Sequence, residues 1–325
     1  MSETAKRIGR RQLNGWALAG LLAAPLNACR KQAPKPVLTL GDQKGGMQSL
    51  LQLSGALENV SYEIKWAEFA DAALLFEALN AGAIDAGIGG DAPFVFFLVS
   101  KPKARAIAAL NYTNKNLSSA AILVERQSSI TSIADLRGRR VAVVRGSTGH
   151  YITLAALRQA GLPLNAVTFT FLDPSDSLSS LSTGAVDAWA TWEPYVAAGE
   201  LHDGLRPLPL PTDLLAGLGF IVATDDAIAN KQPQLTDFIS RFGQARDWAA
   251  ANPAAFTAGF AKDTGVPKDV AAAYVALDTY QVAKIDSTRI DTVQQLADLY
   301  ADAGLLQTRA DISYGFDQAF PFPAS

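Results

Sequence analysis

The same short motif occurs twice in this sequence, at a constant separation. The first copy runs from Ala78 to Ala86 (ALNAGAIDA) and the second from Ser180 to Ala188 (SLSTGAVDA). In each copy a helical stretch ends at a glycine, where a positive φ carries no Cβ penalty, and an aspartate then leads into a short apolar strand. The copies are 102 positions apart, and an acid close to a proline follows each strand at the same separation. The repeat predicts two similar α/β lobes that face each other, with a ligand cleft between them.

Composition excludes several classes of function. The 325 residues can form one large or two medium domains, and the apolar fraction of 49% is typical of a globular protein. A net charge of -3 argues against nucleic acid as a partner, because a nucleic-acid-binding protein needs a basic face. One cysteine and two histidines cannot form a disulfide or the usual cysteine- and histidine-rich zinc sites. We therefore expect no bound metal and no cofactor.

The N-terminal residues have the features of an export signal. A basic segment with two adjacent arginines precedes an apolar run over 16–26 that is too short to span a bilayer. The run ends in a Leu-Asn-Ala-Cys sequence that is similar to a bacterial lipobox and closes at Cys29. We expect 1–29 to be a Sec or twin-arginine signal peptide with lipidation at Cys29, and 30–36 to be a tether. A plain signal peptide cleaved elsewhere, or a disordered tail, is the alternative.

Strands and helices are expected to alternate along the rest of the chain. Apolar and alternating runs predict strands at 37–40, 62–66, 84–88, 106–110, 121–124, 140–144 and 167–171. With helices between them, this order is typical of doubly wound, mostly parallel sheets, so the fold class is α/β.

The segments 206–211 and 218–223 are expected to form the return crossing between the lobes. After it, the pattern predicts only helices over 228–306, and their apolar faces must be buried on the first lobe. We therefore expect lobe I to comprise 37–117 and 224–325, and lobe II to comprise 118–223.

Four motifs resemble those of a known family. They are Asp42-Gln43-Lys44-Gly45, Gly89-Gly90-Asp91-Ala92-Pro93, Gly146-Ser147-Thr148-Gly149-His150-Tyr151, and Leu172-Asp173-Pro174-Ser175-Asp176 followed by 188–195. In this order and spacing, over Leu40 to about Leu306, they resemble substrate-binding proteins of ABC importers for organosulfur anions. The resemblance is closest to the aliphatic-sulfonate-binding proteins, with taurine and nitrate binders as more distant members.

The resemblance implies a fold, a location and partners. The fold is the two-lobed periplasmic-binding-protein fold of type II, with two crossings between the lobes and the ligand in the cleft. The protein is expected in the periplasm as a monomer and membrane-anchored lipoprotein that captures an organosulfonate or a sulfate ester for sulfur acquisition. It then delivers the ligand to an inner-membrane permease that works with its ATPase.

A sulfonate carries a negative charge and only acceptor oxygens, so its site needs hydrogen-bond donors. The N-terminus of a helix offers free N–H groups and a partial positive charge. The turn at 146–148, between a strand and a helix, fits that role, although an ordinary N-capped helix is the alternative. Loops at the carboxyl ends of strands are the usual ligand positions in open α/β sheets. The expected donors are Gln43, Ser119, Gly146, Ser147, Thr148 and His150.

The expected site also includes an apolar wall for the organic part of the ligand and two acidic residues. Trp189 and Trp192 can form an apolar wall, although aromatic residues after short strands often belong to the core. Asp91 and Glu193 either cap helices and face away from the anion, or receive an amine as in taurine. Two positions depart from the family pattern, since Ala92 replaces the usual threonine and Glu193 the usual aspartate.

Other functions remain open at this stage. A taurine or nitrate binder of the same family is the main alternative, and a cysteine-independent enzyme or a sensor on the same fold is a further one. Enzymes with this fold include sulfinate-cleaving ones that use a cysteine, but the sole cysteine here precedes the first predicted strand. No serine–histidine–acid order stands out either. We therefore expect no catalytic residues and a protein that is not an enzyme.

Lipidation can be tested by mass spectrometry of protein extracted from membranes. We expect the mature chain to begin at Cys29 and to carry acyl groups there, because the cysteine closes the lipobox-like sequence. A chain that retains the segment from Met1 to Cys29, or one that is cleaved after another residue, would contradict this prediction.

Overall fold

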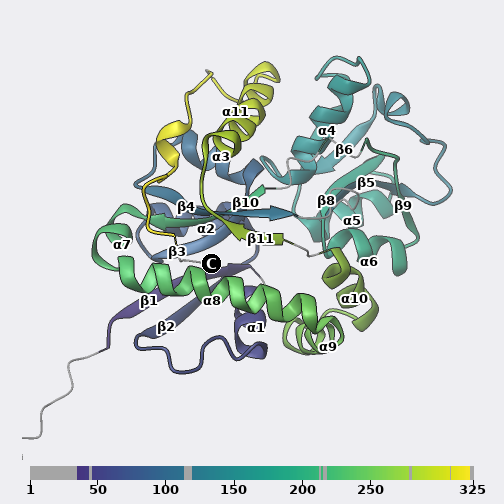
Figure 1. The fold of residues 1–325 in the computed structure, drawn as a ribbon. Helices are drawn as coiled ribbons and strands as arrows, with labels where there is room; N and C mark the ends of the chain where they lie inside the picture. Colours follow the sequence, from purple (N-terminus) through teal and green to yellow (C-terminus); the bar gives the residue numbers. More distant parts are fainter. Residues whose placement is uncertain are drawn as a thin grey trace, which may run out of the picture. The chain divides into compact units, whose positions relative to one another are not determined.

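Two β-sheets organise the chain (Figure 1). The computed structural model describes residues 35–43, 46–112, 119–211, 214, 218–277, 280–307 and 309–322, which lie in one unit, Lys35–Ser325. The expected signal peptide with Cys29, and the tether up to Pro34, lie outside the described residues. Among those described, the first sheet has the strand order β11–β4–β10–β3–β1–β2 and the second β7–β6–β8–β5–β9. We call each sheet with its covering helices a lobe.

The strands of the first sheet are β1 (Val37–Gln43), β2 (Glu63–Phe69), β3 (Ala86–Gly90), β4 (Ala104–Tyr112), β10 (Leu218–Thr224) and β11 (Tyr280–Ala283). Those of the second are β5 (Ala120–Glu125), β6 (Arg140–Val143), β7 (Thr168–Phe171), β8 (Ala188–Trp192) and β9 (Leu205–Pro207). The helices up to the return crossing are α1 (Gly46–Leu53), α2 (Ala72–Asn80), α3 (Asp91–Val99), α4 (Thr148–Gln159), α5 (Pro174–Ser182) and α6 (Tyr195–Leu201). After it come α7 (Asp225–Asn230), α8 (Gln232–Ala251), α9 (Pro253–Thr264), α10 (Lys268–Leu277) and α11 (Ser287–Asp302). Two short 3₁₀ turns, η1 (Ile133–Leu136) and η2 (Ser313–Gly315), complete the described elements.

The repeated motif builds the same corner in both lobes. Gly82 and Gly184 follow the ends of α2 and α5 with φ angles of 68° and 71°. The aspartate of each copy then binds the strand that neighbours its own: a backbone N–H of β1 donates to Asp85 (2.7 Å), and one of β6 donates to Asp187 (2.8 Å). The repeat therefore fixes both the end of a helix and the entry of the next strand into the sheet.

Most strands run in the common direction that the sequence predicted, but both sheets are mixed. β1 pairs in parallel with β2 and β3, and β6 pairs in parallel with β7 and β8. β10 is antiparallel to β3 and β4, and β5 is antiparallel to β8 and β9. Each of these two strands enters its sheet from the other lobe, so no βαβ crossover within the sheet sets its direction.

The position of β10 corrects the expected boundary of the second lobe. Residues 218–223 were predicted to belong to lobe II, but β10 lies between β3 and β4 of the first sheet. All seven of its residues are buried, as expected for a central strand that is covered on both faces. The return crossing therefore lies before Leu218.

The chain after β10 packs mainly with elements of the first sheet. α8 and α9 share a hydrophobic core with α1, β1 and β4, and Figure 1 shows α8 running along one side of this lobe. α11 packs with α2 and α3 in the core on the opposite face. One element differs from the prediction of helices alone: β11 is an edge strand paired with β4. Four residues are too few to show a periodic pattern in the sequence.

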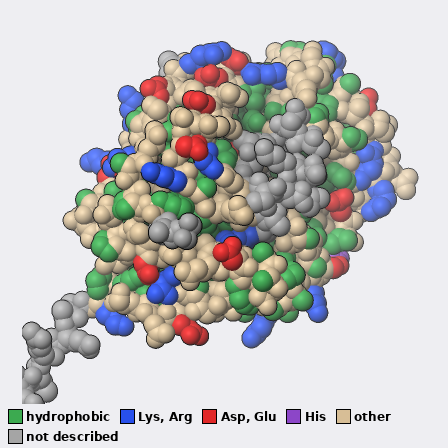
Figure 2. All heavy atoms as spheres, in the orientation of Figure 1, with side chains coloured by type: hydrophobic (Ala, Val, Ile, Leu, Met, Phe, Trp, Pro, Cys, Tyr) green, Lys and Arg blue, Asp and Glu red, His purple; other side chains and the backbone are tan. Residues whose placement is uncertain are grey.

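The surface carries charges of both signs. Figure 2 shows acidic and basic side chains interspersed on the visible face, in keeping with the small net charge. Within the described ranges, no helix has the length and apolar character needed to cross a membrane.

The two turn glycines can be tested by substitution. Gly82→Ala and Gly184→Ala should each lower the free energy of unfolding by about 1 kcal/mol, because a Cβ at positive φ is strained. No neighbouring atom within 4 Å adds to this cost at either position. Gly243→Ala, within α8, should instead raise stability by about 0.5–1 kcal/mol, because glycine is unfavourable inside a helix. Urea unfolding measures all three, and a stabilised Gly184→Ala would contradict the account.

Candidate functional site

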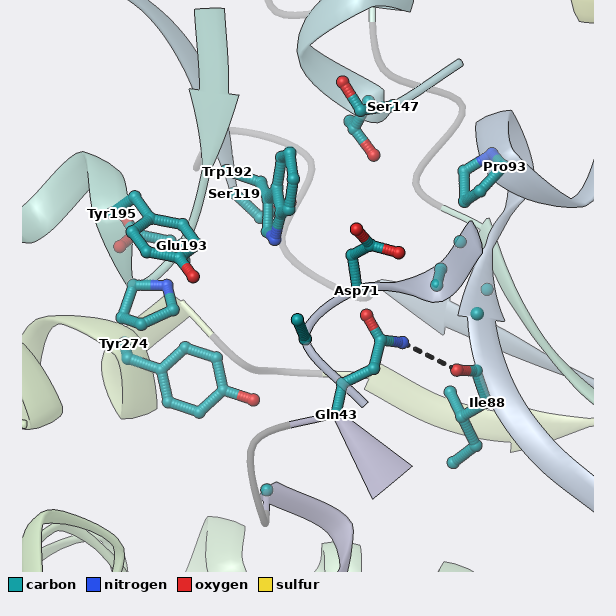
Figure 3. Close-up of a pocket in the computed structure, with 18 of the residues that line it drawn as sticks. Gln43, Asp71, Ile88, Pro93, Ser119, Ser147, Trp192, Glu193, Tyr195 and Tyr274 are labelled. Atoms are coloured by element: carbon teal, nitrogen blue, oxygen red, sulfur yellow. Dashed lines mark hydrogen bonds between the residues drawn. The ribbon is translucent and has the colours of Figure 1, made fainter. Parts of the chain in front are cut away.

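A cavity of about 370 Å³ is lined by both lobes (Figure 3). The first lobe contributes the end of β1, the β3–α3 junction, the start of α2, and residues of α9, α10 and β11. The second lobe contributes Ser119 before β5, the β6–α4 junction, and the β8–α6 junction. The cavity therefore lies beyond the carboxyl ends of strands in both sheets, which is where ligands bind in open α/β folds.

The N-terminus of α4 provides free donors at this cavity. Ser147 is the N-cap, and its Oγ accepts the backbone N–H of His150 (3.2 Å). The N–H groups of Thr148 and Gly149 have no acceptor in the part of the chain that the structure describes. Ser147 and Thr148 both line the cavity. The turn is therefore an ordinary capped helix and also a position suited to an anion, so the two readings of the sequence are compatible.

Two glycines hold this turn in place. A Cβ on Gly149 would lie 2.2 Å from the carbonyl oxygen of Ala190 in β8. Gly146 has a φ of 74°, and a Cβ there would lie 2.7 Å from the ring of Phe96 in α3. Gly146 itself does not line the cavity, so its prediction as a ligand-contacting residue is corrected. Glycine is needed there because the turn packs against the first lobe.

Two further predicted donors lie at the same cavity. Gln43 ends β1, and its side-chain amide donates to the carbonyl of Ile88 (2.8 Å), which fixes the orientation of the amide (Figure 3). Ser119 precedes β5, and its carbonyl accepts the backbone N–H of Glu193 (2.9 Å). Both residues line the cavity, so the structure brings these predicted donors together with Ser147 and Thr148. Their contact with a ligand stays a prediction.

His150 lies outside the cavity lining, contrary to its expected role as a donor. The ring is fully buried, and its Nδ1 accepts the backbone N–H of Gly146 (3.1 Å). It packs edge-on against Phe169, with ring centroids 4.6 Å apart. Burial, and to a smaller extent the charge of Arg145, lowers the pKa of His150 to about 4. The neutral ring therefore stabilises the turn through its hydrogen bond with Gly146.

Three other predicted residues also lie behind the cavity wall. Trp189 belongs to the core of the second lobe, Ala92 is buried at the start of α3, and neither lines the cavity. Asp91 is buried as well, and its Oδ1 accepts the N–H of Ala92 (2.8 Å). Asp91 is therefore the first residue of α3, whose N-cap is Gly90, and it does not line the cavity. Trp192 lines the cavity, and its contact with a ligand stays a prediction.

Glu193 both caps a helix and lines the cavity. Its Oε2 accepts the backbone N–H of Ala197 in α6 (3.1 Å). The side chain is nearly buried, and burial raises the pKa of Glu193 to about 7. A partly protonated carboxyl group at neutral pH repels an anion less than a full charge does.

Several residues that line the cavity were not predicted from the sequence. Asp71 is the N-cap of α2, and its position before an apolar run indicates a helix start but not the direction that it faces. The wall opposite α4 includes Phe260, Val266, Tyr274 and Leu277 from α9, α10 and the segment between them. These residues have no local signal, because only the packing of the C-terminal helices brings them to the cavity. No cluster of potential metal ligands occurs among the residues described.

The buried carboxyl group of Glu193 predicts a pH effect. In the unfolded chain this group loses its proton near pH 4.5, whereas in the folded chain it keeps it up to about pH 7. Between these values the unfolded state binds fewer protons, so the free energy of unfolding should fall as pH rises. We expect Glu193 to contribute on the order of 1–3 kcal/mol to this fall.

Urea unfolding between about pH 5 and pH 8 measures this contribution. Glu193→Gln keeps an acceptor for Ala197 and should give a shallower fall, with higher stability than the parent at pH 8. Asp91 has its pKa raised to about 7 by burial as well, so the variant should retain part of the slope. Parallel curves for parent and variant would contradict the assignment to Glu193.

Comparisons with known proteins identify the family of this chain. The model of the NMT1/THI5-like family matches residues 63–256. A protein of Escherichia coli (strain K12), named as an aliphatic sulfonates-binding protein, is 32% identical over 300 residues, which cover 91% of this chain and 93% of that protein.

Two solved structures are similar over most of their length. The periplasmic aliphatic sulphonate-binding protein from Escherichia coli has a TM-score of 0.79 at 30% identity and covers 90% of this chain and 95% of its own. The alkanesulfonate-binding protein from Xanthomonas axonopodis pv. citri, bound to MOPS, has a TM-score of 0.79 at 29% identity and covers 88% and 99%. The chain therefore has the periplasmic-binding-protein fold and belongs to the NMT1/THI5-like family, together with the aliphatic sulfonate-binding proteins.

Proposed function

We propose that this chain is the extracytoplasmic solute-binding component of an ABC importer and that it captures an organosulfonate or a sulfate ester for sulfur acquisition. The observation that carries the proposal is the N-terminus of α4, where the N–H groups of Thr148 and Gly149 have no acceptor among the described residues. Gln43, Ser119 and Ser147 add polar side chains at the same cavity. The binding of sulfonates by relatives with the same fold supports it.

The number of donors fits a useful affinity. A micromolar complex requires about 8 kcal/mol of binding free energy. Hydrogen bonds to a charged group contribute roughly 1.5–3 kcal/mol each, so four of them contribute about 6–12 kcal/mol, a range that includes this amount before the cost of ordering the ligand is subtracted. The partial positive charge at the start of α4 favours the anion further.

The rest of the cavity suits an organic group. Trp192 and Tyr195 of the second lobe, with Tyr274 and Leu277 of the first, form an apolar wall (Figure 3 labels the three aromatic residues). The volume of about 370 Å³ lies in the range of small-molecule sites, roughly 300–1,000 Å³. Nitrate would leave most of this volume unfilled, which favours an organosulfur anion over the nitrate alternative.

Binding rather than catalysis fits the polar groups at the cavity. A nucleophilic serine needs a base within hydrogen-bond reach. The Oγ of Ser147 accepts a backbone N–H, and Nδ1 of the buried His150 ring accepts another, so these two side chains do not form a nucleophile–base pair. We propose delivery of the ligand to an inner-membrane permease with its ATPase, by a periplasmic protein that is anchored through a lipid at Cys29.

Substitutions at the start of α4 test the site. Thr148→Glu should weaken binding of an alkanesulfonate at least about a hundredfold, or about 2.7 kcal/mol, because it adds a negative charge and fills the space of the anion. Ser147→Ala should weaken binding only up to about tenfold, since backbone N–H groups remain, and should cost about 1 kcal/mol of stability through the lost cap. Isothermal titration calorimetry on folded variants measures both.

A matched control is available in α11. Thr288 is exposed in the first turn of that helix and does not line the cavity, so Thr288→Glu should bind like the parent.

A thermal-shift panel of alkanesulfonates, an arylsulfonate, a sulfate ester, taurine and nitrate identifies the ligand class. Unchanged affinity in Thr148→Glu, or a response to nitrate alone, would refute the proposed function.

A further inference from the structure

Asp71 places a carboxylate at the cavity. Binding of a simple anion does not require such a group. It is the N-cap of α2, and its Oδ1 accepts the backbone N–H of Leu74 (3.0 Å). Its Oδ2 accepts no hydrogen bond from the residues that the structure describes. The side chain is half-buried and lines the cavity, and Figure 3 shows its carboxylate pointing into the open space. A helix cap accounts for one of its oxygens and leaves the other directed at the ligand.

The other charged groups of the cavity have partners. Asp42 is buried, and its two oxygens accept the N–H groups of Met47 (3.1 Å) and Gln48 (2.8 Å) at the start of α1. Glu193 caps α6, as described above. Arg145 is the one cation among the described lining residues, and its guanidinium lies 3.7 Å from the ring centre of Phe171.

No described cation therefore forms an ion pair with Asp71. Lys44, which follows Gln43, lies outside the described residues. A positively charged group of a bound molecule can pair with Asp71 at this cavity.

Aromatic rings at the same cavity favour a cation independently of the acid. Trp192 and Tyr195 meet edge to face, with centroids 5.8 Å apart and an interplanar angle of 90°. Tyr274 lines the cavity from the first lobe, and Figure 3 shows its ring on the same side of the cavity as that of Tyr195. The face of an aromatic ring attracts an ammonium group, and rings at right angles present both a face and an edge to the same space.

We propose that the sulfonate taken by this cavity carries a positively charged amino group and that Asp71 is the residue that selects it. The inference rests on the proposed function, because the same ligand must place its sulfonate at the start of α4. In such a ligand the negative end meets the N–H groups of Thr148 and Gly149, and the positive end meets Asp71 and the aromatic rings. An alkanesulfonate of the same size would bring its apolar end to an uncompensated carboxylate.

A pair of isosteric ligands tests the selection. 3-Aminopropane-1-sulfonate and butane-1-sulfonate differ in an ammonium and a methyl group of similar size. We expect the parent protein to bind the amino compound at least about tenfold more tightly in calorimetric titration, or about 1.4 kcal/mol. Asp71→Asn removes the charge and keeps a good N-cap, so the folded variant should lose that preference by weaker binding of the amino compound and tighter binding of butane-1-sulfonate.

The control is a second N-cap aspartate that lies away from the cavity. Asp286 caps α11 by accepting the N–H of Arg289 (3.0 Å), and Asp286→Asn should keep the preference of the parent. Equal binding of the two ligands by the parent, or an unchanged ratio in Asp71→Asn, would overturn the inference and leave the proposed function standing. Failure of the folded parent to bind any sulfonate of the panel would refute the proposed function as well.

Discussion

The close contact between the start of α4 and β8 is the constraint on which the site depends. Only a glycine at position 149 permits it, because any Cβ would overlap the carbonyl of Ala190. Gly146 allows the same turn to meet Phe96 of the first lobe, and the hydroxyl of Tyr300 donates to the Ser147 carbonyl (3.4 Å). Both lobes therefore hold the turn, and packing rather than a bound ligand positions the start of α4, where Ser147 and Thr148 line the cavity.

The internal repeat made the fold predictable to a large extent. Gly82 and Gly184 need a positive φ, and Asp85 and Asp187 need a strand backbone to bind, so the motif carries its local structure wherever it occurs. The sequence could not place β10, because an apolar run of seven residues fits the centre of either sheet equally well. Its place depends on pairing with β3 and β4, which are more than 100 residues away in sequence.

The residues of the candidate site also differ in whether local sequence or tertiary packing brings them to the cavity. Gln43, Ser119, Ser147 and Thr148 follow or precede strands, and the rule that ligands bind at strand ends was sufficient to find them. The interpretation of His150 failed because a histidine in a helical first turn can face either side, and here its ring accepts a hydrogen bond within the core. The residues of α9 and α10 reach the cavity only through tertiary packing. Local pattern therefore indicated the cavity residues near strand ends but not those of the opposite wall.

The cavity is lined by groups of opposite charge. The start of α4 offers a partial positive charge and unpaired donors, while Asp71 and Glu193 supply carboxyl groups at the same cavity. Burial raises the pKa of Glu193 to about 7, which reduces its repulsion of an anion. Under the proposal that Asp71 selects an amino group, the two ends of the cavity would distinguish ligands by the distribution of their charge as well as by their size.

The central claim is that an anionic sulfur group binds at the N-terminus of α4. A crystal structure of the protein with a bound alkanesulfonate tests it most directly. The account predicts that sulfonate oxygens accept hydrogen bonds from the backbone N–H groups of Thr148 and Gly149, at about 2.7–3.1 Å. A sulfonate bound instead against Tyr274 and Leu277, with the start of α4 making no contact to it, would contradict the claim.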